Sequence, residues 1–386
     1  MKKFLGVNKN IFLLGIVSFL TDLSSELIFS IFSVFVTVIL GASVVLLGFI
    51  EGLADFASSS LDYIAGKISD RTGKRKSVTI FGYGFSTLAK LILVFQTTIL
   101  SAFSFRIIER FGKSIRGPPR DAWIASLTNK NNRGYSFGLH KALDKAGAVL
   151  GPLVAYFVLM SLGQTASTFS LLFKIAFIPA ILSVILLLFI NSAPTKPQKR
   201  ESIFAGLKNA RQELKNYFYS AGIFSLAYFS FSFLLLKAYS VGFQIKEVVL
   251  LYALFNLAFV IFSAPLGKLG DKIGRRKIIA SEYIIYLLMS LGFVFATSKL
   301  AVILLFVLFG IFYSIDEGQS KAYLTDMEKQ RRATVIGLYN FVTGIIYIFA
   351  SIIAGYLWSI NPNYAFVFAA VISILALGVF LGKKRD

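Results

Sequence analysis

Long apolar runs separated by short polar breaks are the feature that most constrains the fold of this chain. The hydrocarbon core of a bilayer is about 30 Å thick, so a helix that crosses it needs about 20 apolar residues. Runs of this length predict helices, because membrane strands show about ten residues of alternating polarity. Twelve windows of the sequence qualify, over residues 11–40, 44–66, 77–96, 98–116, 134–161, 168–190, 217–239, 248–267, 278–297, 300–320, 333–357 and 364–382.

The composition agrees with a bilayer as the surrounding solvent. Hydrophobic residues make up 56% of the 386-residue chain, more than a soluble core requires. Because there is no cysteine and only one histidine, thiolate and histidine metal sites and a Ser/His/Asp set are not expected. No glycine-rich loop with Lys-Ser/Thr is present to hold a nucleotide phosphate. We therefore expect no enzyme, no metal and no other cofactor.

The net charge of +21 lies mainly in every second connection between the apolar runs. The segments 116–133, 196–215 and 321–332 are rich in lysine and arginine, whereas the intervening connections carry at most one each. By the positive-inside rule this pattern predicts a multi-pass protein of the plasma membrane with both termini in the cytoplasm. Anionic lipid headgroups account for the charge better than nucleic acid does, so we expect the former as a partner and not the latter.

A short basic loop occurs twice, once in each half of the chain. The first copy begins at Gly66 and the second at Gly267, and both keep Gly, Asp, Gly and basic residues in register at an offset of 201. A duplicated protein with two parallel repeats of six spans follows. The predicted domains are residues 1–190, a cytoplasmic linker over 191–216 with a short surface helix, and residues 217–386.

The twelve spans, the basic central linker and the Gly-x-x-x-Asp-Arg-x-Gly-Arg/Lys-Arg/Lys loop after spans 2 and 8 resemble the major facilitator superfamily of secondary transporters. The resemblance implies an all-α integral membrane fold with 12 transmembrane helices in two pseudo-symmetric six-helix bundles. It also implies alternating access of a small-molecule substrate to a central cavity. We expect the chain to act as a monomer.

The same resemblance implies that the repeated loops gate the cytoplasmic side. Gly66 and Gly267 are expected to let helices approach closely, and the loop carboxylates to cap a neighbouring helix. The segment 332–334 is expected to face the first loop. The basic residues Arg75, Lys76, Arg276 and Lys277 are expected only to enforce topology. The gating candidates are Gly66, Asp70, Arg71, Gly73, Arg116, Arg120, Asp121, Gly267, Asp271 and Gly274.

Span 5 contains a stretch similar to the Gly-x-x-x-Gly-Pro motif of antiporters in the superfamily. Its glycines, Gly147 and Gly151, are expected to pack closely on another helix, and Pro152 to bend the span. The similarity favours antiport or efflux over uptake. The stretches 21–26, 116–122 and 138–144 further resemble a poorly characterised prokaryotic branch, which implies a class of protein but no cargo.

Charged residues inside the apolar runs carry what substrate information the sequence holds. An ionisable side chain in a bilayer costs several kcal/mol, roughly 3 to 17 depending on the method, so each should face a cavity or a partner. In span 1, Asp22 and Glu26 share one helix face. Span 2 carries Glu51, Asp55 and Asp62 on one face, and span 4 carries Arg106, Arg110 and Lys113 beside Glu109. The candidates for substrate or proton coupling are Asp22, Glu26, Asp55, Arg106, Arg110, Asp144 and Glu317.

Several of these residues have a structural alternative. The acidic and basic stripes could neutralise each other as buried pairs. Lys90, Lys174 and Lys237 are expected to snorkel to an interface, and Glu51 to be solvated at the outer end of its span. His140 is expected to be a hydrogen-bonded structural residue rather than a proton relay. The aromatic residues of spans 7 and 11 could form a bulky substrate wall, although lipid contact explains most of them.

The function predicted from these residues is proton-coupled export of a small organic or amphipathic compound, driven by a gradient. A second hypothesis is an organic-anion or phosphate-ester carrier or exchanger that binds its substrate through Arg106 and Arg110. A hypothesis from another class is a receptor or scaffold that binds a ligand without moving it.

Overall fold

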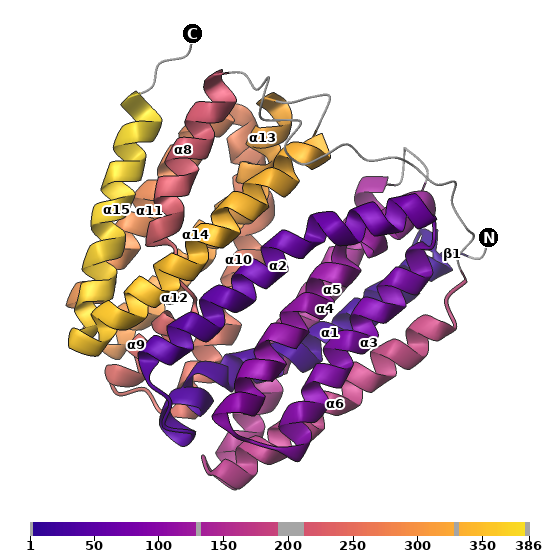
Figure 1. Cartoon of the computed structure of the whole chain (residues 1–386), viewed down its shortest axis with the longest axis horizontal. Coiled ribbons are helices and arrows are strands. Elements are labelled where there is room, and N and C mark those ends of the chain that lie inside the picture. Colours follow the sequence, from indigo (N-terminus) through magenta and orange to yellow (C-terminus); the bar gives the residue numbers. More distant parts are fainter. Residues whose placement is uncertain (1–2, 129–132, 192–211, 328–331, 383–386) are drawn as a thin grey trace. The chain divides into compact units, whose positions relative to one another are not determined.

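The computed structural model describes residues 3–128, 133–191, 212–327 and 332–382, and these are almost entirely helical (Figure 1). The all-α prediction is therefore confirmed. The described helices are α1 (Lys9–Val34), α2 (Val44–Thr72), α3 (Arg75–Phe95), α4 (Ile99–Ser126), α5 (Arg133–Leu162), α6 (Ala166–Leu188), α8 (Gln212–Ala227), α9 (Ser232–Ser240), α10 (Ile245–Ile273), α11 (Arg275–Phe295), α12 (Lys299–Ile315), α13 (Lys321–Met327), α14 (Arg332–Ile360) and α15 (Pro362–Gly382). Most of the predicted linker, including its surface helix, lies outside the described residues.

Eleven of the helical segments described here are long and apolar enough to cross a membrane. The predicted span 4 corresponds to α4, which has 28 residues but carries Arg106, Glu109, Arg110 and Lys113 along its length. Its length is sufficient for a bilayer, but its composition is not apolar. Whether α4 can lie in a bilayer therefore depends on which groups lie next to these four charges.

The helices form two compact units of similar size. Each predicted half supplies most of one unit, but the first part of α2 belongs with the second half and the first part of α10 with the first half. Unit 1 comprises Met1–Gly41, Ser60–Arg200 and Ile245–Ala253, and unit 2 comprises Ala42–Ser59, Glu201–Gln244 and Leu254–Asp386.

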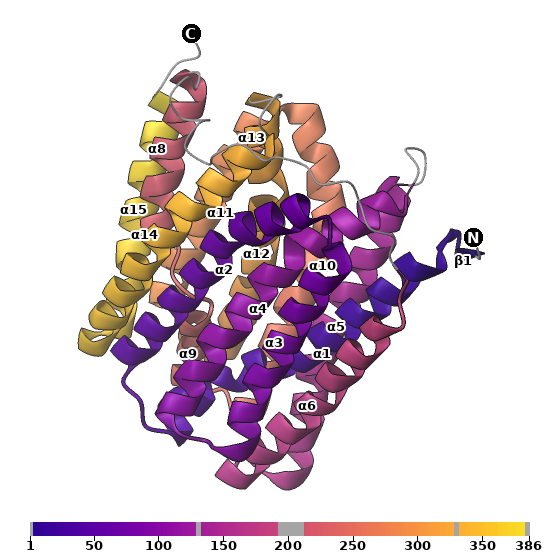
Figure 2. The same ribbon diagram turned by 45° about the vertical axis from the view of Figure 1, so that its right-hand side comes forward.

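In unit 1, α1 packs along α5 and α6, and α3 packs along α4 and α6 (Figure 2). Two glycines of α5 permit the α1 contact. A Cβ atom on Gly151 would lie 2.6 Å from the carbonyl oxygen of Leu23, and one on Gly147 would lie 2.9 Å from the amide nitrogen of Leu23. The expectation that the span 5 glycines allow close packing is confirmed, and their partner is the turn of α1 that carries Asp22 and Glu26.

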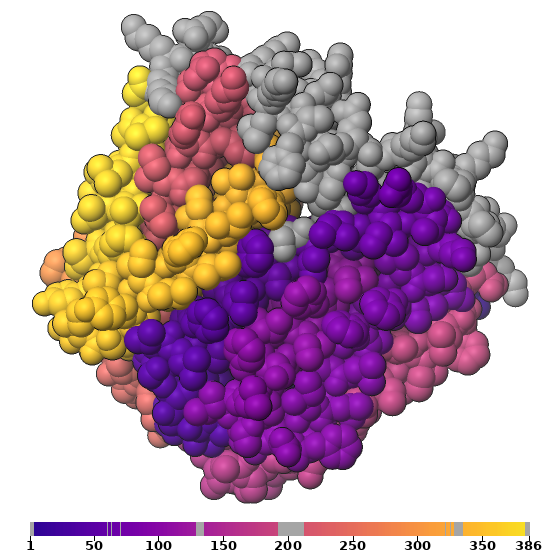
Figure 3. Space-filling view, in the orientation of Figure 1, coloured from indigo at the N-terminus to yellow at the C-terminus, as the bar shows by residue number. Residues whose placement is uncertain are grey.

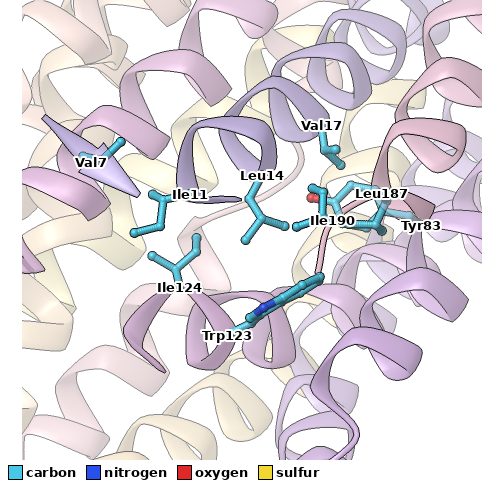
Figure 4. Close-up of a cluster of buried hydrophobic side chains, with 9 residues drawn as sticks. All are labelled: Val7, Ile11, Leu14, Val17, Tyr83, Trp123, Ile124, Leu187 and Ile190. Carbon is cyan, nitrogen blue, oxygen red and sulfur yellow. The ribbon is translucent and has the colours of Figure 1, made fainter. Parts of the chain in front are cut away.

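A cluster of apolar side chains closes the end of unit 1 that holds the chain's first residues (Figure 4). It joins the short antiparallel ladder of β1 (Lys3–Phe4) and β2 (Val7–Asn8) to α1, α3, α4 and α6. Its members are all at most 2% exposed: Val7, Ile11, Leu14, Val17, Tyr83, Trp123, Ile124, Leu187 and Ile190. Most of its members are aliphatic. The hydroxyl of Tyr83 contacts one of the polar groups described below.

In unit 2, α15 packs along α11, α8 and α14. The atoms of α14 and α15, coloured orange and yellow, lie against one another in the space-filling view (Figure 3). Rings fill much of this interior, as in the stacked pair Phe224 and Tyr283, whose centroids are 4.2 Å apart. An aromatic wall was one interpretation of spans 7 and 11, and the rings of unit 2 occupy those positions.

Within the described residues, three spans are not regular α-helices. Span 7 was predicted as one helix, but α8 ends at Ala227 and α9 begins at Ser232. A π-helical turn, η1 (Phe35–Ile39), ends span 1, and a second, η3 (Asp316–Ser320), joins α12 to α13 in span 10. Such irregular turns free backbone groups and re-aim side chains, and they are common at functional sites.

Replacing Gly151 with alanine tests the α1–α5 contact. We expect the free energy of unfolding to fall by about 1–3 kcal/mol, because the added methyl group requires α1 and α5 to separate. The matched change Gly138→Ala lies on the same helix, where a Cβ atom has no heavy atom within 4 Å. It should leave thermal unfolding in detergent unchanged or slightly raise the midpoint. Equal midpoints for the two variants would contradict this account of the packing.

Candidate functional site

Glu26 and Asp22 of α1 are half-buried in unit 1, near charged groups of other helices. The hydroxyl of Tyr252, from the first part of α10, donates a hydrogen bond to Oε2 of Glu26. Asp22 lies within electrostatic range of Lys113, Lys145 and Asp144. The acidic pair therefore has neighbours on α4, α5 and α10.

Arg106 and Arg110 of α4 are packed against aromatic rings of α1. The guanidinium carbon of Arg106 lies 4.2 Å from the ring centroid of Phe29, and that of Arg110 lies 5.1 Å from the same ring. Both arginines also act electrostatically on Tyr252. Cation–π contact of this kind favours a guanidinium in an apolar setting. The structure thus brings the predicted acidic and basic stripes of spans 1 and 4 into one cluster.

A second chain of polar contacts extends from this cluster through α3. Lys90 is fully buried, and its Nζ donates to Oγ of Ser25 over 3.0 Å. Ser25 in turn donates to Oε1 of Glu109 over 3.4 Å. The prediction that Lys90 snorkels is wrong, because its ammonium group finds a hydroxyl and a nearby carboxylate inside the unit. Lys174, by contrast, is exposed.

Arg116 of α4 contacts side chains of both α3 and α4. Its Nη2 lies 3.9 Å from Oε1 of Glu109, its Nη1 donates to Oγ of Ser86, and its guanidinium lies 4.9 Å from the ring centroid of Tyr83. The side chains of Arg116 and Glu109 are 4% and 0% exposed. This is a buried ion pair, and its removal from one side would leave an uncompensated charge. The side chain of Asp70, the predicted partner of the span 4 arginines, lies outside what the structure describes.

His140 lies at a junction of hydrogen bonds near the apolar cluster. Its Nε2 is 2.9 Å from Oγ of Ser18, which is also 3.1 Å from the hydroxyl of Tyr83. Arg120 donates to the same Ser18 oxygen over 3.3 Å and pairs with the exposed Asp121 over 3.0 Å. The expectation that His140 is hydrogen-bonded is confirmed. Asp144, on the same helix, pairs with Lys141 over 3.2 Å.

The three carboxylates that span 2 carries on one face have different neighbours. Asp62 accepts a hydrogen bond from Ser114 over 2.8 Å in unit 1. Asp55 acts on Tyr347 of α14 in unit 2, and Glu51 accepts from Ser230 over 3.2 Å in the same unit. Glu51 is 1% exposed, so the prediction that it is solvated is wrong. The helix changes neighbours along its length, which separates residues that share a face.

Glu317, the predicted carboxylate of span 10, lies with Asp316 on the π-helical turn η3, and both are half-buried. Lys237 of α9 is 7% exposed and donates to Oδ1 of Asn363 over 2.7 Å. An amide at the start of α15 therefore satisfies the Lys237 ammonium group, where the sequence predicted that it would snorkel. The part of the chain that the structure describes holds no group of three His, Asp or Glu placed to bind a metal ion.

The repeated loops turn at glycines with a left-handed backbone, Gly73 with φ of 66° and Gly274 with φ of 93°. The expectation that Gly267 permits a close helix approach is wrong, because a Cβ atom there would meet no described heavy atom within 4 Å. The close approach lies instead at Gly270, where a Cβ atom would meet the side chain of Gln319. One turn along the same helix therefore takes the role assigned to Gly267.

The basic residues of the loops do more than set topology. Lys76 donates to the carbonyl oxygen of Leu188, the last residue of α6, over 2.8 Å. Arg276 donates to the carbonyl oxygen of Phe380 in the last turn of α15 over 3.0 Å. Cations at these positions satisfy carbonyls that have no partner within their own helix and oppose the negative end of the helix dipole. The expectation of a purely topological role is wrong for both residues.

Arg275 connects the second loop to span 10 inside unit 2. It donates to Asp271 over 2.9 Å, to Asp326 over 2.7 Å and to Gln319 over 2.6 Å. Among these, Asp271 was a predicted gating residue, whereas Arg275, Gln319 and Asp326 were not singled out for gating. The sequence does place Asp326 in the next basic connection of the same half, which was the available signal.

Comparison with known proteins agrees with this architecture. The sequence profile of the Major Facilitator Superfamily matches residues 14–315 and 217–386. An uncharacterised MFS-type transporter of Methanocaldococcus jannaschii is 37% identical over 377 residues, which cover 96% of this chain and 94% of that protein. Multidrug resistance protein 2 of Bacillus subtilis is 25% identical over 350 residues, with 86% of each chain covered.

Solved structures share the fold at low sequence identity. The crystal structure of the nucleoside transporter NupG aligns with a TM-score of 0.79 over 98% of this chain and 100% of that one, at 14% identity. A POT family transporter aligns with a TM-score of 0.80, at 13% identity, over 98% and 96% of the two chains. The chain belongs to the Major Facilitator Superfamily. It is a multi-pass membrane transporter and not an enzyme.

The buried pair of Arg116 and Glu109 can be tested by a double-mutant cycle. Arg116→Met should lower the free energy of unfolding by about 3–5 kcal/mol, because it leaves the Glu109 carboxylate buried without its ion-pair partner. Adding Glu109→Gln to the same chain should recover much of that loss. Unfolding of the purified protein in detergent measures both. If the double variant were as unstable as the sum of the two single variants, the pair would not be coupled.

Proposed function

We propose that this transporter exports a small organic or amphipathic compound in exchange for protons. The observation that carries the proposal is the hydrogen bond from Tyr252 to Glu26, in a cluster where Asp22 and Lys113 lie nearby. A carboxylate inside an apolar helix bundle is costly when charged, so it is a natural place for a proton to bind and leave. The relatives named multidrug resistance proteins support export as the direction.

The contact between Glu26 and Tyr252 also suggests how protonation acts on the fold. A hydrogen bond to an ionised carboxylate is roughly twice as strong as one to a neutral group. Protonation of Glu26 therefore weakens the attachment of Tyr252, which lies in the part of α10 that belongs to unit 1. The remainder of α10 belongs to unit 2. A change in one bond of α1 is thereby passed to a helix that both units share.

The proposed cycle uses the remaining candidates as follows. Asp22 or Glu26 takes up a proton in one state and loses it in the other, with Asp55, Asp144 and Glu317 as further coupling groups. The loop residues Asp70 and Asp271 help to latch the cytoplasmic side, where both termini lie. The plasma membrane supplies the proton gradient and anionic lipid at the basic connections. The transporter works as a monomer.

A second candidate function is transport of an organic anion. The stacking of Arg106 and Arg110 on Phe29 favours it, since this contact presents two guanidinium groups on one helix face. Guanidinium groups bind carboxylates and phosphates in a bidentate manner. In this mechanism the anionic substrate, rather than a proton, would compete with the carboxylates of Glu26 and Glu109 for the two arginines.

Neutralising the acidic pair separates the two functions. A compound that raises the thermal unfolding midpoint of the purified protein would be followed in vesicles with an imposed pH gradient. Asp22→Asn and Glu26→Gln should reduce its gradient-driven flux to the level of empty vesicles, because neither amide can carry a proton at neutral pH. Glu247→Gln, an identical change at the start of α10 in the same unit, should retain full flux.

The opposite pattern would favour the anion carrier. Flux that survives Asp22→Asn and Glu26→Gln, but disappears with Arg106→Ala, would contradict proton exchange at the α1 pair. Flux of the wild-type protein that does not respond to the pH gradient would remove proton coupling altogether. Thermal unfolding of each variant provides the control for folding.

A further inference from the structure

The short hairpin of β1 and β2 presents apolar side chains on the surface of unit 1. Phe4 is 51% exposed and Leu5 is 57% exposed, whereas Val7, on the opposite strand, is 2% exposed. The same hairpin therefore packs into the unit on one side and exposes apolar surface on the other. Neither the proposed proton cycle nor the repeated loops use this hairpin.

The turn of the hairpin holds a leucine in a backbone conformation that suits other residues better. The register pairs Phe4 with Val7, so Leu5 and Gly6 form a two-residue turn. Both have a positive φ, 46° at Leu5 and 75° at Gly6. Such turns favour Asn-Gly or Gly-Gly, because most side chains with a Cβ atom are strained in the left-handed region. Leu5 is thus unfavourable in its backbone and in its exposure to water, which indicates a partner outside the protein.

Several contacts fix the hairpin at the ends of two helices. Val7 belongs to the apolar cluster of unit 1, to which α1 and α6 both contribute (Figure 4). The ring centroid of Phe4 lies 4.4 Å from that of Phe12 in α1. Nδ2 of Asn10, in the first turn of α1, donates to the carbonyl oxygen of Asn191 beyond the end of α6 over 3.0 Å. The hairpin is therefore held where α1 begins and α6 ends.

This position sets the level of the hairpin relative to the apolar helices. The segments Lys9–Ile39 and Ala166–Leu188 are both long and apolar enough to cross a membrane. Because the hairpin lies beside one end of each, it is level with the place where hydrocarbon gives way to headgroups. Aromatic and apolar side chains at this level enter the membrane interface when the surface around them is basic.

An exposed tyrosine and several lysines accompany the hairpin. Tyr135 of α5 is 59% exposed, and its Cε1 would lie 3.5 Å from a Cβ atom on Gly6. Tyrosine is typical of the boundary between membrane and water. Lys2, Lys3 and Lys9 flank the apolar pair in the sequence, and the side chain of Lys9 is exposed. Cations beside apolar side chains favour a surface of anionic headgroups.

We infer that the hairpin of β1 and β2 inserts Phe4 and Leu5 into the headgroup region of the bilayer, where the neighbouring lysines bind anionic lipid. The inference goes beyond the proposed function, because it depends on neither the substrate nor the direction of transport. Val7 connects the hairpin to the apolar cluster that includes α1. The lipid attachment therefore fixes the start of the helix that carries Asp22 and Glu26.

The first experiment measures the depth of the turn in the full chain in lipid vesicles. The chain has no cysteine, so Leu5→Cys provides a single site for the fluorophore bimane. Nitroxide groups on lipid headgroups should quench this label, about twofold more strongly on phosphatidylglycerol than on phosphatidylcholine at equal mole fraction. As matched labels, Thr72→Cys at the exposed end of α2 should be quenched by iodide in water, and Ile178→Cys, at a position of α6 that is 57% exposed, by nitroxides deep in the acyl chains.

The second experiment separates the conformation of the turn from its lipid contact. Leu5→Asn supplies the residue that this turn favours, so the thermal unfolding midpoint in detergent should stay equal or rise. With bimane at Phe4→Cys, the added Leu5→Asn should reduce quenching by headgroup nitroxides by about half, because the apolar side chain is lost. Leu5→Met keeps an apolar side chain and should retain the quenching. Lys2→Gln combined with Lys3→Gln should remove the preference for phosphatidylglycerol.

Three results would contradict the inference. Iodide quenching at Leu5→Cys equal to that at Thr72→Cys, with no quenching by nitroxide lipids, would place the turn in water and overturn it. Protection from both quenchers would also overturn it, because another protein surface, such as a second copy of the chain, would then cover the turn. Equal quenching by the two lipids would overturn the binding of anionic lipid. None of these measurements requires transport, so a failure of proton-driven export would leave them unaffected.

Discussion

The need to compensate charge inside an apolar helix bundle governs this structure. A bilayer offers neither water nor counterions, so each ionised side chain depends on partners that the protein itself supplies. In unit 1, an ion pair, hydrogen bonds and cation–π contacts provide these partners. Arg116 lies against Glu109, Lys90 donates to Ser25, and Arg106 rests on Phe29. These contacts account for a 28-residue helix, α4, whose charged composition would not by itself suit a membrane.

Close backbone contact makes such compensation possible. Gly147 and Gly151 allow α5 to approach the turn of α1 that carries Asp22 and Glu26, which places these carboxylates near groups of three other helices. In unit 2, Glu282 and Asp316 instead lie near aromatic side chains, an interrupted helix and a π-helical turn. The two units therefore differ in the chemistry of their interiors.

Much of the fold could be predicted from local patterns, because span length, loop repetition and small-residue spacing are properties of short segments. The twelve windows and the packing of Gly147 and Gly151 are examples. Tyr252 could not be found in this way, since it meets Glu26 across 226 positions of sequence and nothing near it marks the contact. Lys90 was misplaced because its spacing alone does not show that Ser25 faces it. The break between α8 and α9 contains neither proline nor glycine, so no local signal announced it.

The central claim is that half-buried carboxylates of this transporter exchange protons for an exported organic compound. The most direct measurement follows luminal pH in vesicles loaded with ethidium and a pH-sensitive dye, with no initial pH gradient and with the membrane potential clamped. Exchange predicts that the luminal pH falls as ethidium leaves, because protons enter in return. Ethidium that leaves through the protein while the luminal pH stays constant would contradict the claim.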